Sequence, residues 1–262
     1  MGLFRSLAIG LFILTLPVAL LATNIRFAAS EHRVYDYSIR KYDAATVSGI
    51  PETELLRANR ELVGYFTADD PGPLRIDVQD EAGRTLALFN AREIAHLADV
   101  RDLFRAVFTA QTIAVAVVLT VAVLLLVWWP VRALAAAALC SSLLAMGLIG
   151  LAGLVALSGG FHSAWDQFHI LAFTNDLWHL DPATDHLIQM FPEPFWRDAT
   201  LFIGALTLLE ALLIAGTAAI YLIATRPKAA PKAAPIARPL LPRPSGPGRS
   251  SSGPPSQGRL VH

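Results

Sequence analysis

Four long apolar segments constrain this chain more than any other feature of its sequence. They cover residues 3–22, 106–129, 131–157 and 199–224. A helix rises about 1.5 Å per residue and a hydrocarbon core is about 30 Å thick, so about twenty residues suffice for one crossing. The chain is 54% hydrophobic and its mean hydropathy is +0.49. Apolar residues concentrated in four such blocks predict a multi-pass membrane protein.

The distribution of basic residues predicts the orientation of these helices. Residues 226–262 contain seven Lys and Arg and no acidic residue, which is typical of a cytoplasmic segment. Counting four crossings backwards places both termini and the turn at 130–132 in the cytoplasm. Residues 24–105 and 158–198 then lie on the extracytoplasmic side. The second of these connections carries six acidic residues and one basic residue, as an outward-facing segment should.

The two ends of the chain need separate interpretations. Residues 1–23 form either the first transmembrane helix or a cleaved signal peptide, with Arg5 before the apolar run and Ala22 as a cleavage position. The run is longer than that of a usual signal peptide, which favours a retained anchor. Residues 225–262 are rich in Pro, Ala, Ser and Gly, so we expect a disordered cytoplasmic tail with a topological role and weak attraction to anionic lipid.

The predicted fold is an all-α membrane bundle of four transmembrane helices with a small extracytoplasmic α+β insertion. The helices are 1–23, 106–129, 133–157 and 199–224, and the insertion is 24–105. Within the insertion, apolar spacing predicts a helix at 52–66, and alternation predicts two strands at 74–78 and 85–89. Asn90 with Glu93 three residues later predicts a capping box, which starts a helix that leads into the second span.

The connection at 158–198, expected to be an extracytoplasmic loop, is the first candidate for a functional site. It holds four of the seven histidines, at His162, His169, His179 and His186. Its many aromatic rings have a plain explanation as an interfacial belt, since Trp and other aromatic residues prefer the headgroup level. Three explanations compete for the histidines: metal binding, polar residues of a surface loop, and acid–base catalysis on a lipid-level ester. Their spacings match no recognised metal motif, and no HExxH is present.

A second candidate site lies near the start of the second span. Glu93, His96 and Asp99 follow one another at intervals of three residues and therefore share one helix face. A carboxylate near an imidazole stabilises its charged form and strengthens it as a base. The alternative is the solvated polar face of an amphipathic helix. At membrane depth, Cys140 is interpreted as a packing residue, and Glu210 is either functional or hydrogen-bonded to a neighbouring span.

These two regions resemble a known family. In the second connection the resemblance is carried by Phe168, His169, Phe173, Asn175, Asp176, Trp178, Asp181, Pro182, Asp185, Leu187, Ile188, Phe191, Pro192 and Glu193. In the first it is carried by Tyr65 and Phe66 and by residues 96–104, with Leu97 and Arg101 in place of the family's Met and Lys. Together with the four-span layout, this pattern resembles the Lit-type lipoprotein intramolecular transacylases of bacteria.

The resemblance implies an activity and a site. The sn-2 acyl chain of a diacylglyceryl lipoprotein moves to the α-amino group of its N-terminal cysteine, at the extracytoplasmic face of the bacterial cytoplasmic membrane. This ester aminolysis needs a base and an acid but no serine or cysteine nucleophile, no metal and no cofactor. The resemblance implies His169 and His96 as the catalytic residues, with either as base. Supporting candidates are Asp99, Glu93, Tyr65, Asn175, Asp176, Trp178 and Asp181.

Two other classes of function stay open from the residues alone. The first is a membrane lipid-ester hydrolase, metal-dependent or metal-free, in which water replaces the amine as nucleophile. The second is a non-enzymatic membrane interaction or sensor protein, although no cytoplasmic signalling module is recognisable. We expect membrane lipid as a partner and no nucleic acid. The formal net charge of +0 combines a positively charged cytoplasmic side with a negatively charged extracytoplasmic side, which gives no indication of nucleic-acid binding.

Overall fold

The computed structural model describes residues 2–227, without the side chains of residues 155, 157 and 159. The tail predicted to be disordered covers residues 225–262. From residue 228 onward it lies outside the described residues. In chain order the elements are α1 (Gly2–Ser30), α2 (His32–Lys41), α3 (Ala44–Ser48), α4 (Glu52–Thr67), β1 (Asp77–Gln79), β2 (Thr85–Ala87), α5 (Ala91–Trp128), α6 (Val131–Ala172), α7 (His186–Met190) and α8 (Glu193–Ala224).

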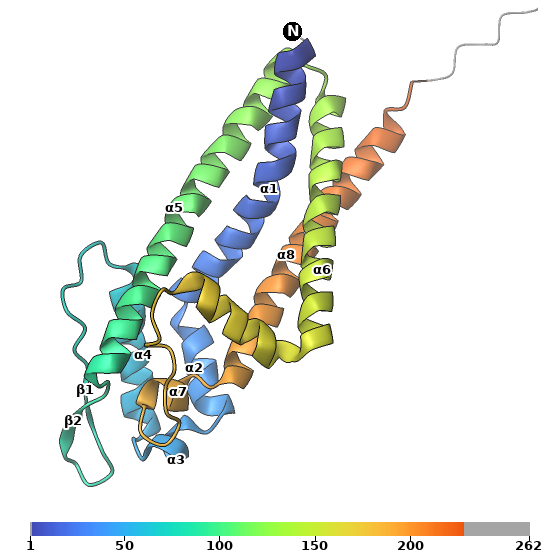
Figure 1. The fold of residues 1–262 in the computed structure, drawn as a ribbon. Coiled ribbons are helices and arrows are strands. Elements are labelled where there is room, and N and C mark those ends of the chain that lie inside the picture. The colour runs from blue at the N-terminus through green and yellow to red at the C-terminus, as the bar shows by residue number, and fades with distance from the viewer. Residues whose placement is uncertain (1, 228–262) are drawn as a thin grey trace, which may run out of the picture. The chain divides into compact units, whose positions relative to one another are not determined.

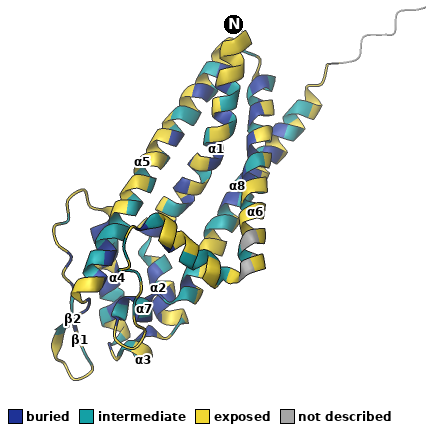
Figure 2. Cartoon of the chain, viewed as in Figure 1, coloured by how far each residue is buried: buried dark blue, intermediate teal, exposed yellow. Residues whose placement is uncertain are grey.

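Four long helices, α1, α5, α6 and α8, form the membrane bundle (Figure 1) and are long and apolar enough to cross a membrane. Helix α1 packs against the other three, and α6 also packs against α8. Apolar side chains of different sizes, such as Phe12, Leu125 and Ala137, fill the interior. Large apolar side chains such as Leu119 and Leu213 are exposed, and exposed residues recur along all four helices (Figure 2). Such a surface suits contact with lipid rather than water. The predicted all-α membrane bundle with a small insertion is confirmed.

A polar contact inside the bundle ties α1 to α8. The Asn24 amide nitrogen donates to the Thr207 hydroxyl at 3.0 Å and to the Glu210 carboxylate at 2.9 Å. Asn24 and Thr207 are buried. Hydrogen bonds between helices are a usual way to hold polar side chains at membrane depth. The structure therefore supports the structural interpretation of Glu210.

Helix α5 extends well beyond one membrane crossing. Its first turns, up to Arg105, alternate charged and apolar residues, and the apolar run starts after them. The helix begins with the predicted capping box: the Asn90 side chain accepts from the backbone of Glu93, whose carboxylate accepts from the backbone of Asn90. These outer turns stand clear of the membrane-spanning part and carry His96 to the domain that caps the bundle.

Helix α6 changes direction sharply at Gly160, whose φ of 76° lies in the left-handed region. Glycine adopts this conformation without the Cβ clash that other residues suffer. Beyond it, residues 161–172 form an outer arm of α6 that turns away from the span (Figure 1). The sequence analysis treated residues 158–198 as a loop. Its first part is helical because Phe161, Trp165 and Phe168 recur at helical spacing and stack on one another.

The capping domain is built from both outer connections. Helices α2, α3 and α4 surround a core with Leu55, Leu62 and Leu88, and α7 contributes Leu187 and Met190 to the same core. The antiparallel hairpin β1–β2 pairs residue 78 with residue 86. The two segments, far apart in sequence, thus form one folded unit that holds the beginning of α5 and the outer arm of α6 in fixed positions.

Candidate active site

The structure brings His96 and His169 together. His96 lies in the second turn of α5 and His169 near the end of the outer arm, and their ring centroids are 6.2 Å apart. Both are buried, with exposed fractions of 7% and 6%. Polar side chains are rarely this buried without a partner or a function. The two motifs that carry the family resemblance therefore meet at a single site.

The ring of His169 is held on several sides. Its Nδ1 lies 2.8 Å from the Trp165 carbonyl oxygen, and because a carbonyl only accepts, Nδ1 is the donor. In the neutral ring the proton then sits on Nδ1, and Nε2 carries the lone pair. The Trp178 indole stacks on the ring at 4.7 Å, and the Trp165 indole meets it edge-on at 4.5 Å. The geometry presents Nε2 as a fixed proton acceptor.

The ring of His96 has an unused polar atom. Within the described chain its Nδ1 is buried and has no hydrogen-bond partner. Its nearest aromatic neighbour besides His169 is Phe173, in a T-shaped contact at 5.2 Å. A buried nitrogen without a partner costs stability, so such atoms are candidates for binding a ligand. The orphaned atom lies on the residue that pairs with His169.

Burial keeps both rings neutral near pH 7. It is the largest cause that lowers the pKa of His96 to about 4; His169 adds to the shift and Asp99 opposes it. Burial also lowers the pKa of His169, while its hydrogen bond to the Trp165 carbonyl opposes that shift. A desolvated imidazole resists protonation because its charged form loses hydration. The pair can therefore accept protons or donate neutral N–H groups.

Asn175 and Arg92 fasten the segment after the outer arm to α5. The Asn175 amide nitrogen donates to the Asp99 carboxylate at 2.9 Å. The Arg92 guanidinium donates to the carbonyl oxygen of Asp176 at 2.7 Å. Asp99 sits one turn beyond His96 and stabilises its charged form. Asp99 and Asn175, two of the supporting candidates from the sequence, thus join the two segments that carry the histidine pair.

Other predicted supporting residues make their contacts outside the histidine pair. The Glu93 carboxylate accepts from the backbone N–H of Leu187 at 2.7 Å and is 1% exposed, so it joins α5 to α7. Burial raises its pKa. Asp181 accepts from the backbone of Ala183 within its own turn, and the side chain of Asp176 is 92% exposed.

Tyr65 and the remaining histidines occupy separate positions. Tyr65 is buried under the Arg101 guanidinium, 5.3 Å from the ring centroid. His179 stacks on Trp178, with ring centroids 3.6 Å apart, and lies near enough to His169 to contribute to the lowering of its pKa. His162 bonds to Glu193 at 2.7 Å and His186 to Gln189 at 2.8 Å. Within residues 2–227, no group of three or more His, Cys, Asp or Glu is arranged to hold a metal ion.

Sequence reasoning missed two contributors to this site. The backbone carbonyl of Trp165 sets the tautomer of His169, and Arg92 clamps the following segment through two carbonyls. The four-residue spacing of Trp165 and His169 is the one sequence signal for the first contact, provided that the segment is helical. The Arg92 contacts could not be predicted, because backbone carbonyl acceptors leave no pattern in the sequence of side chains.

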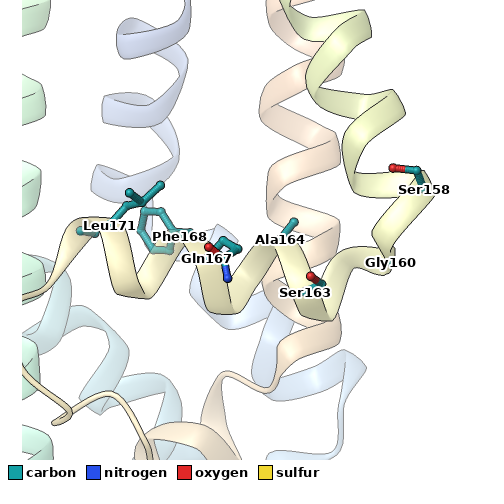
Figure 3. Close-up of a pocket in the computed structure, with 8 residues that line it drawn as sticks. Ser158, Gly160, Ser163, Ala164, Gln167, Phe168 and Leu171 are labelled. Carbon is teal, nitrogen blue, oxygen red and sulfur yellow. The ribbon is translucent and has the colours of Figure 1, made fainter.

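A cavity of about 570 Å³ adjoins the site along the outer arm (Figure 3). Its lining combines apolar side chains with the polar side chains of Ser163 and Gln167. Ala164, Phe168 and Leu171 point from the arm toward the membrane-spanning part of the bundle. Phe168 also contacts the His169 ring at 5.2 Å. Phe168 is thus the lining residue that links the cavity to the histidine pair.

Four membrane-length helices capped by a folded unit with a buried histidine pair define a membrane-integral protein with a candidate active site at one end of its bundle. The family model described as lipoprotein intramolecular transacylase Lit matches residues 10–196. The chain belongs to this family of membrane acyltransferases.

Solved structures agree on the fold. The membrane-integral lipoprotein intramolecular transacylase Lit from Bacillus cereus matches with a TM-score of 0.73 at 19% identity, covering 86% of this chain and 98% of that one. A variant of the same bacterial protein with a histidine replaced by alanine matches with a TM-score of 0.70 at 19% identity, covering 85% and 95%. A search of curated proteins found no match.

Proposed function

We propose that this protein moves the sn-2 acyl chain of a diacylglyceryl lipoprotein to the α-amino group of its N-terminal cysteine, with His169 and His96 as the catalytic pair. Membership of the transacylase family supports the reaction class. The observation that carries the site assignment is the buried pair itself, whose rings lie 6.2 Å apart where the two family motifs meet.

The reaction is an ester aminolysis. The amine nitrogen attacks the ester carbonyl carbon, a C–N bond forms, and the C–O bond to the glycerol breaks. His169 Nε2 removes the proton from the attacking amine, and the resulting imidazolium returns it to the departing glycerol oxygen. One imidazole can serve both steps because the substrate starts and ends without net change in protons.

His96 has the complementary role in this proposal. Since burial keeps it neutral, it is poorly suited to carry a full positive charge. It donates an N–H hydrogen bond to the oxygen that becomes negative in the tetrahedral intermediate, and Asp99 stabilises the charge that develops on its ring. The amine and the ester belong to one molecule, so orientation supplies much of the rate.

The apolar cavity along the outer arm fits the acyl chain of such a substrate. It begins beside Phe168, which contacts His169. An acyl chain in this cavity would bring its ester to the histidine pair while the lipoprotein stays anchored in the membrane. Membrane lipid is then a constant neighbour of the substrate, and no feature of the described residues points to nucleic acid.

We propose the topology that the sequence predicts. The enzyme sits in the bacterial cytoplasmic membrane with both termini in the cytoplasm, and residues 24–105 and 158–198 form the capping domain on the extracytoplasmic face. The basic residues of 226–262 support this orientation. It matches the chemistry, since lipoproteins present their modified cysteine on that face.

Product analysis tests the proposed reaction. Purified protein is incubated with a synthetic diacylglyceryl lipopeptide, and the products are separated by chromatography and identified by tandem mass spectrometry, whose fragments locate the acyl chain. Transfer gives an N-acylated lyso-lipopeptide of unchanged mass with the acyl chain on nitrogen. Release of free fatty acid would instead identify a hydrolase, and unchanged substrate under conditions that support a Lit enzyme would contradict both.

A further inference from the structure

A second groove lies at the opposite end of the bundle from the histidine pair. It has a volume of about 460 Å³ and is formed between α1, α6 and α8. Ile9 and Ile13 line it from α1, and Leu222 lines it from α8. The beginnings of α1 and α6 and the end of α8 lie at the end of the bundle opposite the capping domain (Figure 1). The transacylase reaction has no use for a groove at this end.

Two arginines, Arg5 and Arg132, line the same groove. The Arg132 guanidinium uses one nitrogen, Nη1, to donate to the Leu222 carbonyl at 3.0 Å and to the Thr225 hydroxyl at 2.7 Å. Both acceptors are neutral, so they fix the position of the guanidinium without balancing its charge. Its other nitrogens stay available. Arg5 is exposed at the rim.

No acidic residue of the described chain balances these cations. Arg5 and Arg132 take part in none of the ion pairs within residues 2–227. Helix α1 contains no Asp or Glu, α6 contains none before Asp166, and α8 contains none after Glu210. The end of the bundle is therefore cationic next to an apolar groove, a combination that suits a ligand with an anionic head and an apolar tail.

We propose that this groove binds an anionic phospholipid. The phosphate lies against Arg132 and Arg5, and one acyl chain runs along Ile9 and Ile13 between α1 and α6. Arginine suits this role because its planar group pairs with phosphate through two parallel hydrogen bonds. Basic pockets between transmembrane helices at a membrane surface are a known setting for anionic headgroups. The proposal does not depend on the acyl-transfer chemistry at the other end of the bundle.

The test compares lipids of different charge on the full-length protein. Delipidated protein in neutral detergent is titrated with phosphatidylglycerol, phosphatidylcholine or inorganic phosphate, and binding is followed by native mass spectrometry and by thermal unfolding. We expect one tightly retained phosphatidylglycerol and a larger rise in Tm than with phosphatidylcholine. Equal retention of the two lipids would overturn the proposal, and protection by inorganic phosphate alone would show a soluble-anion site instead.

Arg5→Gln is the decisive variant, because Arg5 has no hydrogen bond or ion pair in the described chain whose loss could unfold the protein. It should weaken phosphatidylglycerol binding by about fivefold, the effect expected for one basic residue near an anionic lipid. Arg132→Gln should weaken it by at least as much. Thr225→Val removes a neutral partner of Arg132 and should keep the preference. Arg33→Gln, on the exposed surface of α2, is the matched charge control. Full phosphatidylglycerol preference in Arg5→Gln would contradict the site.

Discussion

The indole of Trp178 lies against the imidazole of His169, with ring centroids 4.7 Å apart and planes inclined by 25°. This contact comes from the segment that Asn175 and Arg92 fasten to α5. Trp178, which follows the outer arm in sequence, therefore helps to fix the His169 ring on that arm. The geometry of the histidine pair depends on both outer connections, because each supplies one ring and the start of α5 holds the segment that carries Trp178.

Trp178 should act as a positioning residue. Trp178→Leu removes the flat surface that holds the His169 ring, and we expect acyl transfer to fall by roughly 10- to 100-fold, as for small misplacements of a reacting group. Trp178→Phe keeps a stacking ring and should retain most of the rate. Single-turnover transfer assays measure both. The idea fails if the Leu and Phe variants are equally active.

Glu93 should matter for stability. Glu93→Ala removes the acceptor of the buried N–H of Leu187 and of the partly buried N–H of Asn90, and we expect a loss of about 2–4 kcal/mol from the two hydrogen bonds. Glu93→Gln retains one oxygen acceptor and should lose less. Unfolding in detergent, followed by tryptophan fluorescence, gives both values. A Tm of Glu93→Ala equal to that of the wild type would show that the contact is dispensable.

The pH profile should report the lowered pKa values. Burial lowers the pKa of His96 to about 4 and also lowers that of His169. A lowered pKa means that protonation requires a more acidic solution, so the neutral, active rings persist as pH falls below the usual histidine value of about 6.5. Because the attacking α-amine itself titrates near pH 8, the imidazole signals of His96 and His169 are followed by NMR rather than through the transfer rate, and their midpoints should lie below that value. A midpoint at or above it would show that the rings are solvated.

Labelling of single cysteines tests the proposed orientation. In a Cys140→Ala background, cysteines at Asp70 and Thr184 should react with an impermeant reagent in intact spheroplasts. A cysteine at Val131, which is exposed near the other end of the bundle, should react only after the membrane is made permeable. Protection of the first two positions and reaction of the third would reverse the orientation.

The membrane helices could be predicted because their signal is composition, which needs no knowledge of packing. The Asn90 capping box was also visible, since it depends on two residues three apart. Helices α2 and α3 were not predicted. Only Tyr35, Ser38 and Ile39 of α2 are buried, and a short helix rich in charges is stabilised by the core that it packs on rather than by its own sequence pattern.

The family resemblance predicted that His96 and His169 act together. It did not predict the packing that brings the two rings together. Packing between distant segments decides that His96 and His169 are buried, and no local pattern encodes it. The sharp turn at Gly160 is of the same kind: a glycine after an apolar run is compatible with a straight helix, a kink or a loop. The hydrogen bond from His169 to the Trp165 carbonyl becomes predictable only once residues 161–172 are known to be helical.

The most direct test of the account is the rate of N-acylation in His169→Ala and His96→Ala variants. Each purified variant is given a diacylglyceryl lipopeptide, and the N-acylated lyso product is quantified by mass spectrometry, with His186→Ala as a matched control. We predict losses of about 10²- to 10⁴-fold for the two catalytic variants at unchanged expression, and little change for the control. N-acylation at the parental rate by either His169→Ala or His96→Ala would contradict the proposed mechanism.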